Sequence, residues 1–158
     1  MTYKLTILPQ SELCLIAYSG RVTEGDLEAV RAALHSSSDH RPHFDELVAI
    51  GPDADYSEVS FEIARVRAQR YVANESSPIQ LKRLAFVCAN EVQLAMARLF
   101  DALVKADGPS NLEVNCFQHL SAAVAWLEQA KAAGSIDRAQ IRSILAEMGH
   151  AWCCSEEV

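Results

Sequence analysis

Residues 84–100 read LAFVCANEVQLAMARLF, and they contain the structural unit that decides the fold. The first six residues are small or apolar, which is typical of a strand covered on both faces of a sheet. Asn90 follows directly and can cap a helix, because its side chain accepts the free backbone N–H groups of a first turn. The residues that then recur at helical spacing are Val92, Met96, Leu99 and Leu103. The stretch therefore predicts a central strand followed by a helix with those four residues on its buried side.

The same unit of strand and helix occurs on both sides of this stretch. The other predicted pairs are residues 13–19 with a helix capped by Thr23 and Asp26, 44–50 with 58–72, and 112–117 with a helix opened by His119 or Ser121. Residues 3–8 form a further predicted strand, and the short polar turn PQSE after it favours antiparallel pairing with the next strand. Because crossovers join strands that alternate with helices, residues 1–133 are predicted to form an α/β domain. We expect a mixed, mostly parallel sheet of about five strands with four packed helices.

The last segment, residues 134–158, is different in character. Gly134 is a natural hinge, and Ser135 can cap one more helix. Its apolar face contains Ile141, Leu145, Met148 and Trp152. Such a face either folds back on its own domain or binds another copy of the chain. We predict a homodimer contact through these four residues.

Composition limits the classes of function. The chain has 158 residues, as expected for one domain, and a formal charge of −7, which disfavours binding to nucleic acid. No apolar run approaches the ~20 residues needed to span a membrane. The N-terminal residues lack the apolar stretch of a signal peptide, so a cytoplasmic location is expected.

Charged and sulfur-containing side chains are interpreted as structural. Five cationic residues lie close together in the sequence: Arg65, Arg67, Arg70, Lys82 and Arg83. This pattern is typical of a solvated helix face followed by a charged strand start. Cys14, Cys88 and Cys116 lie in strand-like runs and are expected to behave as small apolar residues, whereas Cys153 and Cys154 form an exposed pair. No cysteine spacing indicates a metal site.

Three phrases carry a resemblance to a known family. They are GRVTEGDLEAV at 20–30, LAFVCANEVQLAMARLF at 84–100 and CFQHLSAAVAWLEQ at 116–129. With the order of the elements, they resemble the SpoIIAA-like group of the STAS-like superfamily over residues 3–130. This resemblance implies a single α/β domain without chemistry of its own. Regulatory members bind a partner kinase that phosphorylates a serine at the start of the second helix, and other members are grouped with carriers of apolar ligands.

The matching corner in this chain reads GPDADYSEVS at residues 51–60. Regulatory members carry an Asp-Ser-Ser-Gly-like sequence there, and here the Ser-Ser-Gly is missing. Ser57 and Ser60 are the phosphorylation candidates that the resemblance implies, and Asp53, Asp55 and Tyr56 would form an interaction surface beside them. The alternative is that Ser57 only caps the helix, with Ser60 at its third position. Asp53 and Asp55 could also share a metal, although acids before a helix more often compensate its dipole.

No catalytic pattern is present in the sequence. There is no nucleophile elbow and no phosphate-binding glycine loop, and His35, His40 and His43 are irregularly spaced around Asp39. We therefore expect a non-enzymatic regulatory or interaction domain with a protein partner and with no metal or cofactor. The alternative is a carrier or sensor of a small apolar ligand. Four small or soft residues on facing helices favour this alternative: Ala64, Ala68, Ala95 and Met96.

Overall fold

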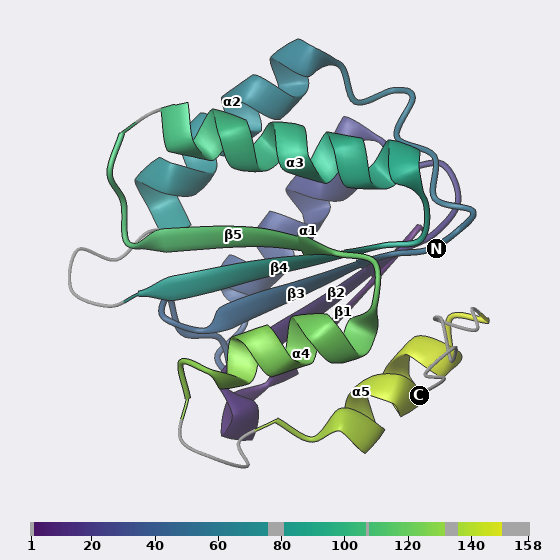
Figure 1. The fold of residues 1–158 in the computed structure, drawn as a ribbon, viewed down its shortest axis with the longest axis vertical. Helices are drawn as coiled ribbons and strands as arrows, with labels where there is room; N and C mark the ends of the chain where they lie inside the picture. The colour runs from purple at the N-terminus through teal and green to yellow at the C-terminus, as the bar shows by residue number, and fades with distance from the viewer. Residues whose placement is uncertain (1, 76–80, 107, 132–135, 150–158) are drawn as a thin grey trace.

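A computed structural model describes residues 2–75, 81–106, 108–131 and 136–149. One five-stranded sheet lies between two layers of helices (Figure 1). The strands are β1 (Tyr3–Leu8), β2 (Leu13–Tyr18), β3 (Asp45–Ile50), β4 (Lys82–Cys88) and β5 (Leu112–Phe117). They lie in the order of the sequence, and a short 3-10 turn over Pro9–Ser11 joins the first two.

The sheet is mixed, as predicted. β1 is antiparallel to β2, with Tyr3 opposite Tyr18, and β2, β3, β4 and β5 are parallel to one another. The parallel strands advance in one direction across the sheet. Because crossovers between parallel strands are right-handed, their three connecting helices must lie on the same face.

The helices follow this rule. α1 (Glu24–Ser36), α2 (Phe61–Glu75) and α3 (Glu91–Ala106) connect the parallel strands and cover one face (Figure 1). α4 (Leu120–Glu128) and α5 (Arg138–Ala146) come after the last strand and cover the other face. The predicted set of four helices and a C-terminal fifth is therefore confirmed.

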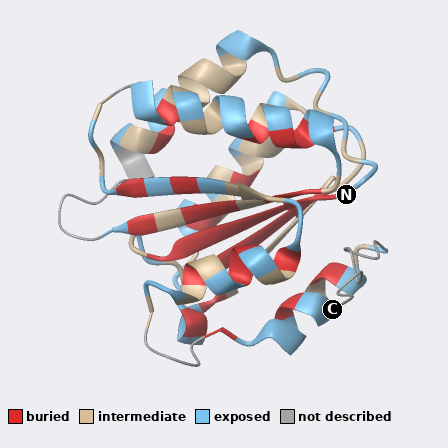
Figure 2. Ribbon diagram, viewed as in Figure 1, coloured by how far each residue is buried: buried red, intermediate tan, exposed pale blue. Residues whose placement is uncertain are grey.

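The alternation of side chains along the central strands produces two cores. β2 and β3 are buried along their whole length, whereas the helices are buried only on their inner faces (Figure 2). Cys14, Ile16, Val48, Ile50 and Leu84 face the layer of α1, α2 and α3. Leu13, Leu15, Leu47, Ala49 and Val87 face the layer of α4 and α5.

The helix starts agree in part with the predicted caps. Thr23 and Asp26 form the complete capping box at α1, and Asn90 Oδ1 accepts the N–H of Gln93 at 3.0 Å at α3. α4 follows His119 without a side-chain cap bond. α5 is capped by Asp137, two residues beyond Ser135, which lies outside the described residues.

The predicted buried stripe of α3 was right for Met96 and Leu103, which are partly buried, and wrong for Val92 and Leu99. Val92 is 73% exposed and Leu99 is 37% exposed, whereas Gln93, Leu94, Ala97 and Val104 are buried. Apolar residues occur on most sides of this helix, so spacing alone did not identify which side faces the sheet. The same ambiguity affects α2, where Phe61 is 58% exposed.

α5 packs against its own sheet. Ile141 and Leu145 are fully buried with strand residues such as Leu15 and Leu47, and Met148 packs at the edge of that core. Trp152 lies outside the described residues. The two buried side chains are already used within the chain, so a dimer contact through them would require α5 to leave the sheet. Homodimerisation itself stays a prediction.

Among the described residues, no helix is long and apolar enough to cross a membrane.

Removing the Ile141 side chain tests whether α5 belongs to the domain. Ile141→Ala should lower the free energy of unfolding by about 2–5 kcal/mol, because it leaves a cavity under the sheet. Ser143→Ala is the matched control on the exposed side of α5 and should change this free energy by about 0.5 kcal/mol or less. Urea unfolding measures both. Equal stability of the two variants would contradict the docking of α5.

Candidate functional site

A cavity of about 130 Å³ lies between the sheet and the layer of α1, α2 and α3. Its apolar walls include Ile50, Ala64, Phe86, Met96, Ala97 and Phe100. Its polar lining groups include Tyr18, Arg31, Tyr56, Arg67 and Gln93. Tyr18, Arg31 and Arg67 come from β2, α1 and α2, whereas Phe86, Met96 and Phe100 come from β4 and α3. The cavity is therefore amphipathic across the sheet.

Small side chains leave this space open. Ala64 on α2 and Ala97 on α3 line the cavity, where longer side chains would fill it. Ala68, named with them from the sequence, is fully buried in the adjoining core. Ala95 is exposed, so its predicted place between the helices was wrong. Met96 does line the cavity.

The corner at residues 51–60 forms one wall of the cavity. Tyr56 lines it and packs edge-on against Tyr18, with the ring centroids 5.9 Å apart. Burial raises the pKa of Tyr56 well above its ordinary value, so its hydroxyl stays protonated at neutral pH. The predicted interaction surface and the cavity therefore share Tyr56.

Backbone contacts hold this corner in place. Asp55 N donates to Gly20 O at 2.8 Å, and Val22 N donates to Asp55 O at 2.9 Å. Gly20 N donates to a carboxylate oxygen of Asp53 at 3.2 Å. Gly20 has φ +63°, a conformation that glycine adopts readily and that other residues rarely do. Asp53 and Asp55 thus fix the corner to the end of β2.

The buried side chain of Gln93 connects the corner to α3. Its Nε2 donates to Gly51 O at 2.7 Å, and its Oε1 accepts from Ala89 N at 2.8 Å. Sequence reasoning missed this residue. The sequence feature that could have identified Gln93 is its position three residues after Asn90. The side chain of a capping-box residue at this position reaches back toward the helix start.

Ser57 and Ser60 do not have the positions in the helix that the sequence predicted. α2 begins at Phe61, and Ser60 Oγ accepts the N–H of Ile63 at 3.2 Å, so Ser60 is the cap. The prediction that Ser57 caps the helix was wrong. Ser57 N instead donates to Asp55 Oδ1 at 2.9 Å in a turn before the helix. Hydrogen bonds from the backbone and hydroxyl of Ser57 lower the pKa of Asp55.

A buried ionic cluster, Glu46 with Arg31 and Lys82, adjoins the cavity at the start of β3 and β4. The Glu46 carboxylate accepts two hydrogen bonds from the Arg31 guanidinium, at 3.0 and 2.8 Å. Lys82 Nζ lies 3.0 Å from the same carboxylate, and both Glu46 and Lys82 are 0% exposed. The Tyr71 ring lies 4.9 Å from the Arg31 guanidinium and 5.6 Å from Lys82 Nζ. Lys82 does belong to a charged strand start, as interpreted from the sequence, but its side chain is buried in the core.

The charge of Glu46 depends on its two partners. Burial alone would raise its pKa, but Arg31 and Lys82 hold the pKa well below its usual range. A buried carboxylate with two cations keeps its charge down to acidic pH. Loss of this carboxylate would remove the negative charge that both buried cations contact, which is costly in the core.

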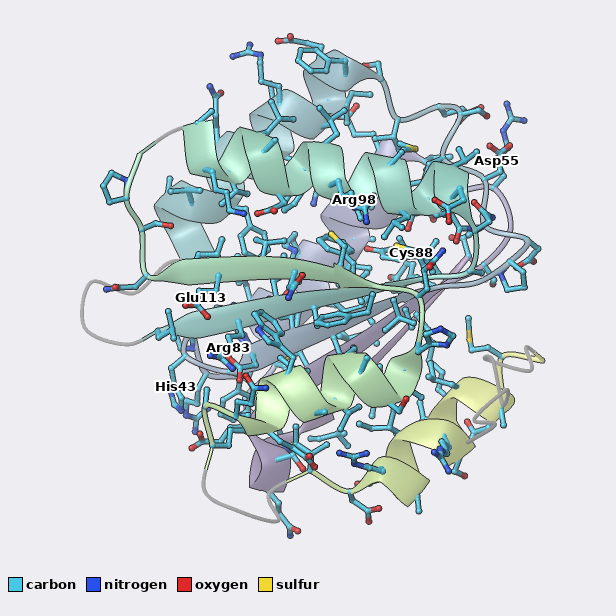
Figure 3. All side chains as sticks on the ribbon, viewed as in Figure 1. His43, Asp55, Arg83, Cys88, Arg98 and Glu113 are labelled. Carbon is cyan, nitrogen blue, oxygen red and sulfur yellow. The ribbon has the colours of Figure 1, made fainter. Side chains whose placement is uncertain are left out.

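The opposite face of the sheet carries a second pair of charges. Arg83 N donates to Asp45 Oδ1 at 2.7 Å, and its guanidinium lies 4.8 Å from the Trp126 ring. Glu113 accepts from Arg83 Nε at 3.0 Å. Figure 3 shows Arg83 and Glu113 at the end of the sheet away from Asp55. Asp45 pairs with Lys131, whose Nζ lies 3.3 Å from the Asp45 carboxylate. β3 thus starts with two acids and β4 with two bases, and the alternation of strand side chains puts one acid and one base on each face.

The remaining candidates do not assemble into a site. Among the described residues, no group of three or more histidine, cysteine or acidic side chains could hold a metal ion. His40 and His43 pack edge-on against Phe44 instead. Cys88 and Cys116 lie in β4 and β5, and burial raises their pKa to about 12 and about 11. Such thiols are protonated at neutral pH and weakly reactive. Cys153 and Cys154 lie outside the described residues.

A family model described as SpoIIAA-like matches residues 13–128, well over half of the chain. The chain belongs to the SpoIIAA-like family. The matched part of this SpoIIAA-like chain runs from β2 to the end of α4, so it includes the cavity, the corner and the ionic cluster. Searches among curated proteins and among solved structures gave no significant match. The resemblance seen in the three sequence phrases is confirmed.

The ionic cluster predicts a strong effect of a small substitution. Glu46→Gln should lower the free energy of unfolding by about 3–5 kcal/mol at pH 7, since the two cations lose their carboxylate. The folded-state pKa of Glu46 lies below its unfolded-state value, so its contribution is present above that value and is lost progressively below about pH 5. The stability gap between wild type and variant should therefore shrink from pH 7 to pH 3, as measured by urea unfolding.

Glu113→Gln is the control, because its pair with Arg83 is half exposed. This variant should lower the free energy of unfolding by about 1 kcal/mol or less. If the difference in free energy of unfolding between wild type and Glu46→Gln did not change with pH, the stabilising role of the Glu46 charge would be contradicted.

Proposed function

We propose that this SpoIIAA-like domain is a non-enzymatic binding and regulatory module that takes a small apolar ligand in the cavity. The observation that carries the proposal is the cavity between the sheet and α1–α3, with walls that are mainly apolar. Apolar cavities of this size are able to take up molecules about as large as benzene. Ligand sites are commonly concave and apolar with a few placed polar groups, and this cavity has that composition.

The position of the corner suggests how the bound state reaches a protein partner. Tyr56 and Gln93 line the cavity, and both also belong to the hydrogen-bonded corner at 51–60. Asp53, Asp55, Ser57 and Ser60 are exposed on the outside of the same corner. A ligand that displaces Tyr56 would therefore change the surface offered to a partner. We also propose that the module acts in the cytoplasm without a metal or cofactor.

A cavity-filling substitution tests ligand binding. Ala97→Leu should weaken binding of 3-phenyl-1-propanol by about tenfold or more, because the added atoms occupy the cavity. Ala95→Leu makes the same change on the exposed side of α3 and should bind the alcohol as wild type does. Isothermal titration calorimetry measures the three affinities. If both variants bound the alcohol with equal affinity, the cavity would not be the binding site.

Phosphorylation of the corner is a second proposal, and the exposure of Ser57 and Ser60 supports it. A phosphate on Ser57 would carry nearly two negative charges beside Asp55, which now accepts hydrogen bonds from that serine. The resulting repulsion would open the turn and release Tyr56. The same modification would therefore act on the partner surface and on the cavity wall.

Mass spectrometry of protein purified from its own source tests this proposal. We expect added phosphate that maps to Ser57 or Ser60 and that phosphatase treatment removes. A chain without phosphate at either serine would leave the corner as a structural turn and helix cap. Native spectra of the same sample report whether the chain is a dimer.

A further inference from the structure

The polar side chains on the wall of the cavity are mainly hydrogen-bond donors. In the described part of the chain, these side chains are Tyr18, Arg31, Tyr56, Arg67, Tyr71 and Gln93. A guanidinium group has several N–H donors and no acceptor, and a phenol hydroxyl carries one donor. None of the described lining residues has a carboxylate. The wall therefore offers a ligand donors more readily than acceptors.

The amide of Gln93 does not change this balance. Its oxygen accepts from Ala89 N at 2.8 Å, and its nitrogen donates to Gly51 O at 2.7 Å. Both ends of the amide therefore hold the corner to α3, and the amide oxygen, an acceptor in this wall, is already engaged.

The hydroxyl of Tyr18 is a buried donor on this wall. Tyr18 ends β2, lines the cavity and is only 5% exposed. Among the described residues, none forms a hydrogen bond with its hydroxyl. A buried hydroxyl without a hydrogen bond is costly, and most buried polar groups in folded proteins have a partner. A ligand in the cavity is able to supply that partner.

Tyr56 places a second phenol against the first. Its ring packs edge-on against the ring of Tyr18, with the centroids 5.9 Å apart, and it also lines the cavity. Its hydroxyl, too, has no hydrogen bond with any residue that the structure describes. Burial raises the pKa of Tyr18 to about 12 and that of Tyr56 well above its ordinary value. Both phenols are therefore neutral at pH 7 and keep the proton that they can donate.

We infer that the cavity binds a neutral, mainly apolar carbonyl compound, whose oxygen accepts a hydrogen bond from the Tyr18 hydroxyl. Its apolar body lies against Phe86, Met96 and Phe100. The inference rests on the proposed function, because it names the chemistry of the ligand in the same cavity. A carbonyl oxygen accepts hydrogen bonds and brings no donor of its own to a wall of donors. A neutral head also brings no new charge into a buried space.

Two probes with one carbon skeleton test the chemistry of the head. They are 4-phenyl-2-butanone, which only accepts hydrogen bonds, and 4-phenyl-2-butanol, which also donates one. Titration calorimetry of wild-type protein at pH 7.5 should show the ketone binding about fivefold or more tighter than the alcohol. The difference corresponds to one neutral hydrogen bond, because the alcohol brings a further donor to a wall that already has many.

Tyr18→Phe identifies the donor, because it removes the hydroxyl and keeps the ring. This variant should bind the ketone about fivefold or more weakly than wild type, while its affinity for butylbenzene, which has no polar atom, stays unchanged. Tyr3→Phe is the matched control. Tyr3 lies opposite Tyr18 in the sheet and packs at the edge of the same core, but it does not line the cavity. This control should bind both probes as wild type does.

The outcomes separate this inference from the proposed function. If wild type binds butylbenzene but does not prefer the ketone to the alcohol, the carbonyl inference is overturned and the apolar ligand site remains. If ketone, alcohol and hydrocarbon all fail to bind, the ligand site and the inference fall together. The wild-type comparison decides the chemistry of the head even if Tyr18→Phe does not fold.

The variants decide which residue holds the carbonyl. Equal losses of affinity for ketone and butylbenzene in Tyr18→Phe would mean that the residue only shapes the cavity, which overturns its role as donor. If Tyr56→Phe weakens ketone binding and Tyr18→Phe does not, the assignment to Tyr18 is overturned in favour of Tyr56.

Discussion

The carboxylate of Glu46 is the constraint on which this side of the molecule depends. It is buried in a central strand, where an unpaired charge would be very costly, so the structure must supply partners from other elements. Arg31 brings α1 to the sheet, Lys82 ties β4 to β3, and Tyr71 of α2 lies against both cations. One buried acid thus connects two strands and two helices. The right-handed crossovers put α1 and α2 over this face, and the contacts of the cluster fix them there.

The cavity is a consequence of that arrangement. Arg31 is held by Glu46 on one side and lines the cavity on the other, so the cluster that joins the elements also gives the cavity one of its polar side chains. Ala64 and Ala97 leave the space open, and Tyr56 lines it at the corner. The same few contacts therefore connect the ionic cluster, the cavity and the exposed surface at residues 51–60. This continuity supports our proposal that a ligand in the cavity changes the surface offered to a partner.

The sequence predicted the fold more fully than the site. Strand–helix alternation, the caps at Thr23 and Asn90 and the antiparallel first strand depend on local patterns, and these were read correctly. The buried side of α3 and the place of Lys82 depend on contacts between distant segments. The acids at Asp45 and Glu46 and the bases at Lys82 and Arg83 begin adjacent strands, and only the pairing of β3 with β4 brings Lys82 to Glu46 and the Arg83 backbone N–H to Asp45. The cavity arises from helix placement, which no single stretch of sequence specifies.

A crystal structure determined under xenon pressure tests the central claim most directly, because xenon binds against apolar cavity walls and the walls of this cavity from β4 and α3 are apolar. Our account predicts a xenon atom between the sheet and α3, close to Phe86, Met96 and Phe100. Ala97→Leu crystals should lose that atom and otherwise keep the same structure. A xenon-free space in wild-type crystals, filled by side chains or by ordered water, would contradict the account.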